Sequence, residues 1–244
     1  MNKSIVISFV CLFLSCSLIS QDNGETVGGF YFGPKLGLTL GTQNWDGGER
    51  RPMANYHIAL YTESLDPNLT GSLFAQVGYH SRGSGLNVVN LTLGFNSSQA
   101  FIYRNLNMTF GVKKRLLTSQ ASTPYYFVGV RGEYQLSNNL ADVQNRFQLG
   151  ASTLFYPVDI YVNKFTYGLA FGGGFEFAGS KFVQPGIEFT FSPDLNFQYR
   201  SPEIPSVINP YSGQPTSLPE RKIRNLSFEI SLVLRFLREV VYLD

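Results

Sequence analysis

The stretch GPKLGLTLGT, Gly33 to Thr42, decides the fold. Leucine stands at positions 36, 38 and 40, and glycine, lysine or threonine occupies the positions between. This two-residue period is that of a β-strand with one apolar face and one small or charged face. In a soluble sandwich the apolar face would point into a core, whereas in a membrane barrel it would point outward to lipid. The pattern in the rest of the chain distinguishes a soluble sandwich from a membrane barrel.

The same alternation recurs along the chain and predicts about eight strands. Each run is long enough to cross a bilayer when tilted, which takes roughly 9 to 11 residues. We therefore predict an all-β fold, a closed antiparallel eight-stranded transmembrane β-barrel. Ten strands are the alternative, because 86–95 and 144–154 could form two more. We interpret these two segments as parts of long loops.

The connections between the runs are of two kinds, short at 64–69 and 178–181 and long at 42–54, 82–99, 136–160 and 200–223. Short turns at one rim and long loops at the other are typical of outer-membrane barrels. The long loops are therefore the expected functional surface. Trp45, the only tryptophan, lies in the first of them beside mixed charges and is a candidate partner contact.

Aromatic residues give a second indication of a membrane barrel. One predicted belt contains Phe30, Phe32, Tyr125, Tyr126, Phe175, Phe177 and Phe182, and the other contains Tyr56, Tyr79, Phe165, Tyr167 and Phe191. Two belts separated by aliphatic residues are what bilayer interfaces select. We therefore expect Lys35 to point into the barrel and the leucines beside it to face lipid.

The first twenty residues predict a secretory signal peptide, with a basic start at Lys3 and an apolar stretch that follows. An N-terminal membrane anchor is the alternative, but the apolar stretch is shorter than the roughly 20 residues of a spanning helix. We expect residues 1–20 to be removed and 21–244 to form the barrel domain. Both cysteines, Cys11 and Cys16, lie in the signal segment, so disulfides and thiol chemistry are not expected. The nearly neutral net charge of the chain, +2, gives no indication of nucleic-acid binding.

Charged side chains recur on the inward parity of the predicted strands. They are Lys35, Glu63, His80, Arg82, Arg131, Glu133, Lys164, Glu176, Glu188, Glu229 and Arg235. The interior of an eight-stranded barrel is just wide enough to be filled by side chains, so we expect these charges to pair into a polar plug. Near mid-barrel we expect Lys35 to pair with Glu229. A narrow path for small solutes or ions is the alternative.

An enzyme is not predicted. Catalysis needs a nucleophile, a base and an orienting group within reach of one another. The chain has two histidines, His57 and His80, and no acid at a matching spacing stands out. A lipid-modifying barrel enzyme is therefore the third alternative. No metal-ligand spacing and no cofactor motif is present, so no metal and no cofactor are expected.

Several short motifs resemble a known family. They are FGPKLG at 32–37, GYHSRGS at 78–84, GVRGEY at 129–134, SPDL at 192–195, NLSF at 225–228 and RF at 235–236. Together they resemble the PorT-like outer-membrane β-barrel proteins of Bacteroidota. The resemblance implies an eight-stranded monomeric barrel in a Gram-negative outer membrane, in contact with outer-membrane lipid and lipopolysaccharide. It also implies partners among envelope proteins or proteins of type IX secretion. The tail from Leu237 to Asp244 departs from the family pattern, in which the barrel ends at an aromatic residue.

Overall fold

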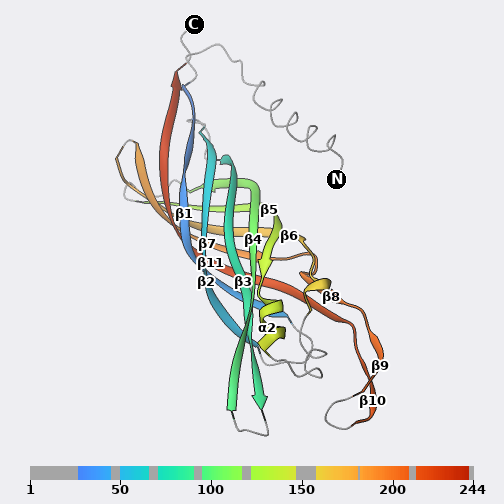
Figure 1. Ribbon diagram of the computed structural model, residues 1–244. Coiled ribbons are helices and arrows are strands. Elements are labelled where there is room, and N and C mark those ends of the chain that lie inside the picture. The colour runs from blue at the N-terminus through green and yellow to red at the C-terminus, as the bar shows by residue number, and fades with distance from the viewer. Residues whose placement is uncertain are drawn as a thin grey trace, which may run out of the picture.

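The computed structural model describes residues 27–44, 50–65, 71–90, 95–116, 122–146, 158–180, 182–208 and 213–241. Eight long strands form one closed antiparallel sheet (Figure 1). They are β1 (Val27–Asn44), β2 (Arg50–Leu65), β3 (Gly71–Asn90), β4 (Phe95–Arg115), β5 (Ser122–Asn138), β6 (Phe165–Phe177), β7 (Val183–Pro193) and β11 (Arg221–Val241). The predicted eight-stranded barrel is confirmed. The predicted signal peptide and Trp45 lie outside the described residues.

The barrel closes between its first and last strands. β1 and β11 pair from Val27 opposite Val241 to Asn44 opposite Arg224. Glycine in the opening stretch permits this seam, because a Cβ on Gly37 would lie 1.9 Å from the carbonyl oxygen of Ile230. No side chain tolerates such an overlap, so the two backbones approach this closely only where glycine stands.

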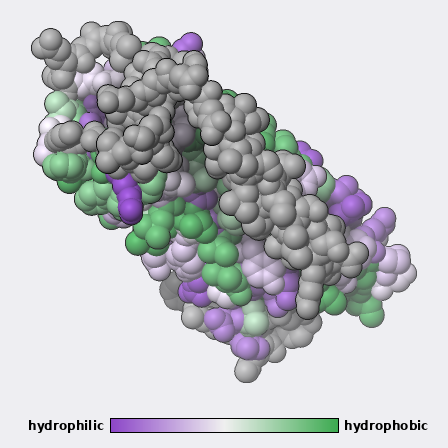
Figure 2. All heavy atoms as spheres, turned by 90° about the horizontal axis from the view of Figure 1, so that it is seen from above, coloured by the Kyte–Doolittle hydropathy of each residue, from purple (hydrophilic) through white to green (hydrophobic). Residues whose placement is uncertain are grey.

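The alternation of the opening stretch separates the inside of the barrel from its outside. Leu36, Leu38 and Leu40 are 48%, 58% and 44% exposed, whereas Lys35 is 2% exposed. The same outward face carries exposed leucine, valine, isoleucine and phenylalanine on every barrel strand, and hydrophobic patches are visible on the surface in Figure 2. Because so much exposed apolar surface is unfavourable in water, this face is the one that meets lipid. Within the described part of the chain, no helix has the length and apolar character to span a membrane.

The two ends of the barrel differ. The start of β1 and the end of β11 lie at one end, where the connections are short (Figure 1). The other end carries α2 (Leu140–Arg146), the 3-10 helix η3 (Asp159–Tyr161) and the short strands β8 (Tyr199–Ser201), β9 (Ile204–Ile208) and β10 (Pro215–Leu218). We call these the termini end and the loop end.

Two expected long loops are mostly strand. β3 and β4 stay paired from Ser81 opposite Arg104 to Asn90 opposite Phe95, so the segment 82–99 is a hairpin that extends past the barrel. The segment 42–54 also shortens, because β1 ends at 44 and β2 begins at 50. The reason is that backbone pairing between two neighbouring strands can continue beyond the rim without any further strand. This also explains why 86–95 adds no ninth barrel strand. Of 144–154, the described residues 144–146 end α2.

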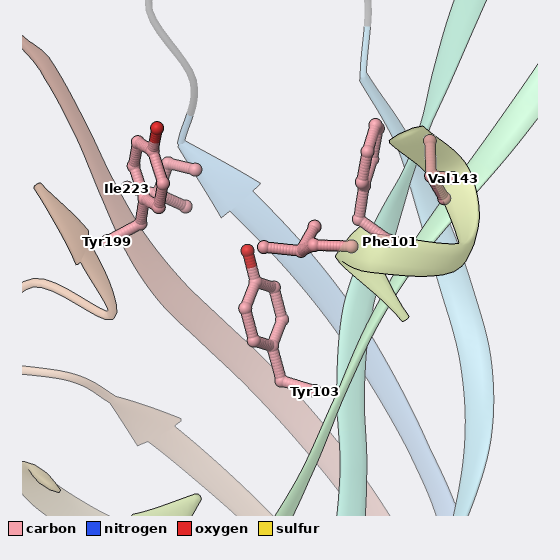
Figure 3. Packing of buried hydrophobic residues seen from close by; sticks show 6 residues of the cluster. Phe101, Tyr103, Val143, Tyr199 and Ile223 are labelled. Atoms are coloured by element: carbon pink, nitrogen blue, oxygen red, sulfur yellow. The ribbon is translucent and has the colours of Figure 1, made fainter. Parts of the chain in front are cut away.

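An apolar cluster fills the lumen at the loop end. Its buried members come from β4, α2, β8 and β11, and they are Phe101, Tyr103, Leu140, Val143, Tyr199 and Ile223. Figure 3 shows these side chains pointing toward one another between the strands and α2. Each is no more than 2% exposed. We call this cluster the apolar cap.

Candidate functional site

Below the apolar cap, the inward parity of the strands fills the lumen with charges at three levels. The loop-end cluster consists of His80, Arg82, Arg131, Glu133, Asp194 and Glu229. The middle pair consists of Lys35 and Glu188. The termini-end cluster consists of Glu63, Lys113, Arg115, Glu176 and Arg235. The alternation places these residues inside the barrel, and the register between strands decides which of them meet.

Glu133 on β5 is the centre of the loop-end cluster. Its Oε1 lies 3.0 Å from His80 Nε2, 3.1 Å from Arg82 Nη2 and 2.6 Å from Arg131 Nε. Asp194, directly after β7, receives Arg82 Nη1 at 3.0 Å and also pairs with Arg131. One carboxylate therefore joins three cationic or basic side chains, and a second carboxylate joins the two arginines again.

Glu229 on β11 closes the loop-end cluster from the opposite side. Its Oε1 lies 3.3 Å from His80 Nδ1 and 3.8 Å from Arg82 Nη2. Both nitrogens of the His80 ring are thus placed against carboxylates, one from β5 and one from β11. A histidine in this position connects strands that are not neighbours in the sheet.

Amide side chains hold the carboxylates of the loop-end cluster in place. Asn105 Nδ2 donates to Glu133 at 2.8 Å, and Asn225 Nδ2 donates to Asp194 at 2.9 Å. Gln43 Nε2 donates in turn to Asn225 at 2.7 Å. Since a buried carboxylate is costly unless its lone pairs are satisfied, these amides are part of what makes the cluster tolerable.

The middle pair joins β1 to β7 across the lumen. Lys35 pairs with Glu188, and the Tyr125 hydroxyl donates to the other Glu188 oxygen at 2.9 Å. The expected pairing of Lys35 with Glu229 is wrong, because register and strand tilt turn Glu229 toward His80 instead. The placement of Tyr125 in an aromatic belt is also wrong, since this residue is 5% exposed inside the lumen.

The glycines of β6 make room for the aromatic side chains beside the middle pair. A Cβ on Gly172 would lie 2.3 Å from Phe127 Cζ, and a Cβ on Gly174 would lie 2.7 Å from the Tyr125 hydroxyl oxygen. Gly172 and Gly174 are therefore explained by packing against inward aromatic side chains, and a Cβ on Gly173 would lie 2.7 Å from the Tyr125 carbonyl oxygen.

The termini-end cluster surrounds two carboxylates with three cations. Lys113 Nζ lies 3.0 Å from Glu63 and 2.5 Å from Glu176, and Arg115 Nε lies 2.9 Å from Glu176. Arg115 also pairs with Glu63, and Arg235 pairs with Glu176. Because each carboxylate has several basic neighbours, the stability of the cluster does not depend on a single ion pair.

The predicted set of charged lumen residues contains one wrong residue and lacks three that the structure places there. Lys164 was expected in the lumen, but it is exposed just before β6, and the inward alternation begins only after it. Lys113 and Arg115 were omitted, although continuing the inward parity of β4 by two more steps would have found them. Asp194 was also omitted, although it is buried on the inward parity of β7, one step beyond Ser192. An isolated antiparallel bridge to Gly168 extends the pairing to Asp194 beyond the end of the strand.

Two cavities that Lys35 lines in the lumen are small. Their volumes are about 10 and 20 Å³, which is room for about one water molecule each. In the described part of the chain, no three His, Cys, Asp or Glu side chains are arranged to hold a metal ion. Among the described residues, the side chains around Lys35 therefore leave little free space.

One arrangement in the lumen resembles part of a catalytic relay. His57 Nε2 lies 2.9 Å from Ser231 Oγ, and its Nδ1 lies 2.9 Å from Thr39 Oγ1. A nucleophilic serine needs a base oriented by an acid and needs access to substrate. Here the third group is a hydroxyl, and Ser231 is 0% exposed. This geometry fits a structural hydrogen-bond chain between β1, β2 and β11.

Comparisons with known proteins agree with the fold. No protein-family model and no curated protein matches the chain. The chain is similar to the structure of the outer membrane protein OprG from Pseudomonas aeruginosa, with a TM-score of 0.52 and 12% identity over 88% of this chain and 99% of that one. For Neisserial surface protein A, the TM-score is 0.42 and the identity is 10%, over 85% of this chain and 96% of that one. For Ail of Yersinia pestis, the TM-score is 0.38 and the identity is 9%, over 87% of this chain and 100% of that one. The closed barrel, its apolar outer face and the likeness to OprG show that this chain has the fold of the eight-stranded outer-membrane barrels.

Proposed function

We propose that this protein is a non-conducting outer-membrane barrel that serves the cell envelope as a structural and interaction component. More specifically, we propose that it acts as an accessory of type IX protein secretion. The short family motifs of the sequence support the secretion role. The architecture supports the interaction role, because the extended β3–β4 hairpin and the β9–β10 ribbon offer protein surface beyond the loop-end rim (Figure 1).

The single observation that carries the proposal is the closed lumen. From the apolar cap to the termini-end cluster, side chains fill the barrel at every described level. A solute path needs a continuous polar channel with sites that bind weakly enough to release their ligand. Here each charged residue of the three levels lies within ion-pair distance of an opposite charge, which favours a rigid interior over a solute path.

Planar-bilayer recording tests this proposal against the pore alternative. We expect the purified full chain to give no stable single-channel currents, and Lys35→Met to give none either. Robust currents from the unmodified protein, with an ion preference that shifts in Lys35→Met while heat resistance is kept, would falsify the closed lumen. Arg104→Gln, an exposed arginine on the outside of β4, is the matched control for a change in charge.

The interaction role is tested at the loop end. A cysteine at Ser217 on β10 should react with a membrane-impermeant reagent in intact cells, whereas one at Ser180 in a termini-end turn should not. A photo-crosslinker at Ser217 should then capture an envelope protein that the same probe at Ser180 does not capture. Labelling at Ser180 alone would invert the orientation, and no specific capture at Ser217 would remove the support for a protein partner.

A further inference from the structure

Three basic side chains gather on the lipid-facing side of the loop-end rim. Arg224 and Lys222 lie on the outward parity of β11, and Arg200 on β8 is paired in register with Lys222. Below them on the same face of β11 follow Leu226, Phe228 and Ile230, which are 39%, 39% and 41% exposed. A cationic group therefore sits directly at the upper end of an apolar stripe.

The height of this group matches the headgroup region of the membrane. Phe228 pairs with Phe191, a member of the aromatic belt at the loop end. Arg224 is four residues further along β11, which is about 13 Å along the strand and about 10 Å along the membrane normal for a tilted strand. This distance takes Arg224 from the edge of the hydrocarbon into the layer where lipid phosphates lie.

Phe197 positions the cations. The Arg224 guanidinium carbon lies 4.3 Å from the centre of the Phe197 ring, and Lys222 Nζ lies 5.8 Å from it. The backbone at Phe197 is held in place, because its carbonyl accepts a hydrogen bond of 2.7 Å from Asn163 Nδ2. A guanidinium that stacks on an aromatic face keeps its N–H groups available at the edge.

The local charge remains positive. Glu220 is the acidic partner in the group, bonded to Arg200 Nε at 2.7 Å and to Lys222 Nζ at 2.5 Å. Arg224 stacks on Phe197 and has no carboxylate partner among the described contacts. Three cations and one carboxylate leave an excess of two positive charges at the surface, next to a site where an acyl chain can lie.

We propose that Arg224, Lys222 and Arg200 form a binding site for the phosphate of an outer-leaflet lipid, whose acyl chain lies along Leu226 and Phe228. The planar guanidinium of Arg224 matches the fork geometry of a phosphate, and Lys222 adds a second charge. The apolar stripe below the cations selects a lipid over a free phosphate, because only a lipid covers both. This inference rests on the proposed place of the barrel in the outer membrane.

The test uses the full chain in phosphatidylcholine nanodiscs that contain diphosphoryl lipid A or the same lipid A with its phosphates removed. Native mass spectrometry measures how much lipid A stays bound. We expect the unmodified protein to keep the phosphorylated form about tenfold better, as expected for losing charge-assisted hydrogen bonds. The double variant Lys222→Gln with Arg224→Gln should lose that preference, and Arg104→Gln should keep it.

A variant of Phe197 gives a second test of the phosphate site. Phe197→Leu removes the ring without changing charge and should reduce the preference by a smaller factor, which provides a test if the double variant folds poorly. Equal retention of both lipids, or an equal loss in Arg104→Gln, would overturn the site. Competition by millimolar inorganic phosphate would overturn the lipid assignment. A protein recovered soluble without detergent would instead refute the outer-membrane barrel itself.

Discussion

The loop-end and termini-end clusters use the same chemistry in two different ways. In the loop-end cluster three carboxylates meet two arginines and one histidine, and each side chain is 5% exposed or less. In the termini-end cluster three cations meet two carboxylates, and the Arg115 side chain is 16% exposed. Only the first lies under the apolar cap. The charges of the loop-end cluster are therefore stabilised by their partners, whereas those of the termini-end cluster are stabilised partly by solvent.

The largest effect should come from the loop-end cluster. Arg82→Met leaves Glu133, Asp194 and Glu229 with too few cations, so we expect the free energy of unfolding to fall by roughly 3 to 5 kcal/mol. Urea unfolding in lipid vesicles, followed by heat-modifiable gel mobility, measures this loss. Adding Asp194→Asn should recover part of it. A loss as small as that at the termini end would break the comparison.

A smaller effect is expected at the middle pair. Lys35→Met strands Glu188, but the Glu188 side chain is 13% exposed and Tyr125 still donates to it. We expect a loss of about 2 to 3 kcal/mol, reduced from the value for a fully buried pair. Lys35→Met with Glu188→Gln should recover stability in the same unfolding assay, whereas Lys35→Met with Glu229→Gln should not. Recovery by the second combination would contradict the pairing seen here.

The termini-end cluster should tolerate the loss of one cation. In Arg115→Gln, Lys113 and Arg235 still face Glu63 and Glu176, so two cations remain for two carboxylates. We expect the free energy of unfolding to fall by about 1 kcal/mol. The matched comparison is Arg82→Gln, measured under the same conditions. Equal losses for the two glutamine variants would show that the apolar cap has no influence.

The smallest effect concerns Glu220, outside the lumen. Hydrogen bonds from Lys222 and Arg200 lower the pKa of the Glu220 carboxyl below its ordinary value. Because the pKa of Glu220 is lower in the folded state, the ionised carboxylate contributes to folding stability at neutral pH. This contribution is lost as the pH falls through that pKa. The Glu220 side chain is 34% exposed and solvent screens its ion pairs, so Glu220→Gln should leave the unfolding curve nearly unchanged. An NMR titration should show the pKa of Glu220 rising in Lys222→Gln, and an unchanged titration would refute the contact.

Much of the candidate site could be predicted from alternation alone. The inward parity identified Glu63, His80, Arg131 and most of the other charges that the structure places in the lumen. It could not identify their partners, because pairing across a barrel depends on shear, and an error of one residue in register changes every contact. Asp194 shows the other limit. It continues the inward parity of β7 past Pro193 through an isolated bridge to Gly168, and alternation alone does not say how far a strand extends.

The sequence by itself determined the barrel, its two faces and the charged character of its interior. Those properties follow from the period of two along each strand, which is local and needs no knowledge of neighbours. Only the tertiary structure decided how the interior is divided. It extended β3 and β4 past the rim, brought residues from β4, α2, β8 and β11 into the apolar cap, and turned Glu229 to His80 instead of Lys35. The physical reason is that strand register and loop return are set by contacts between distant segments, which a single strand does not encode.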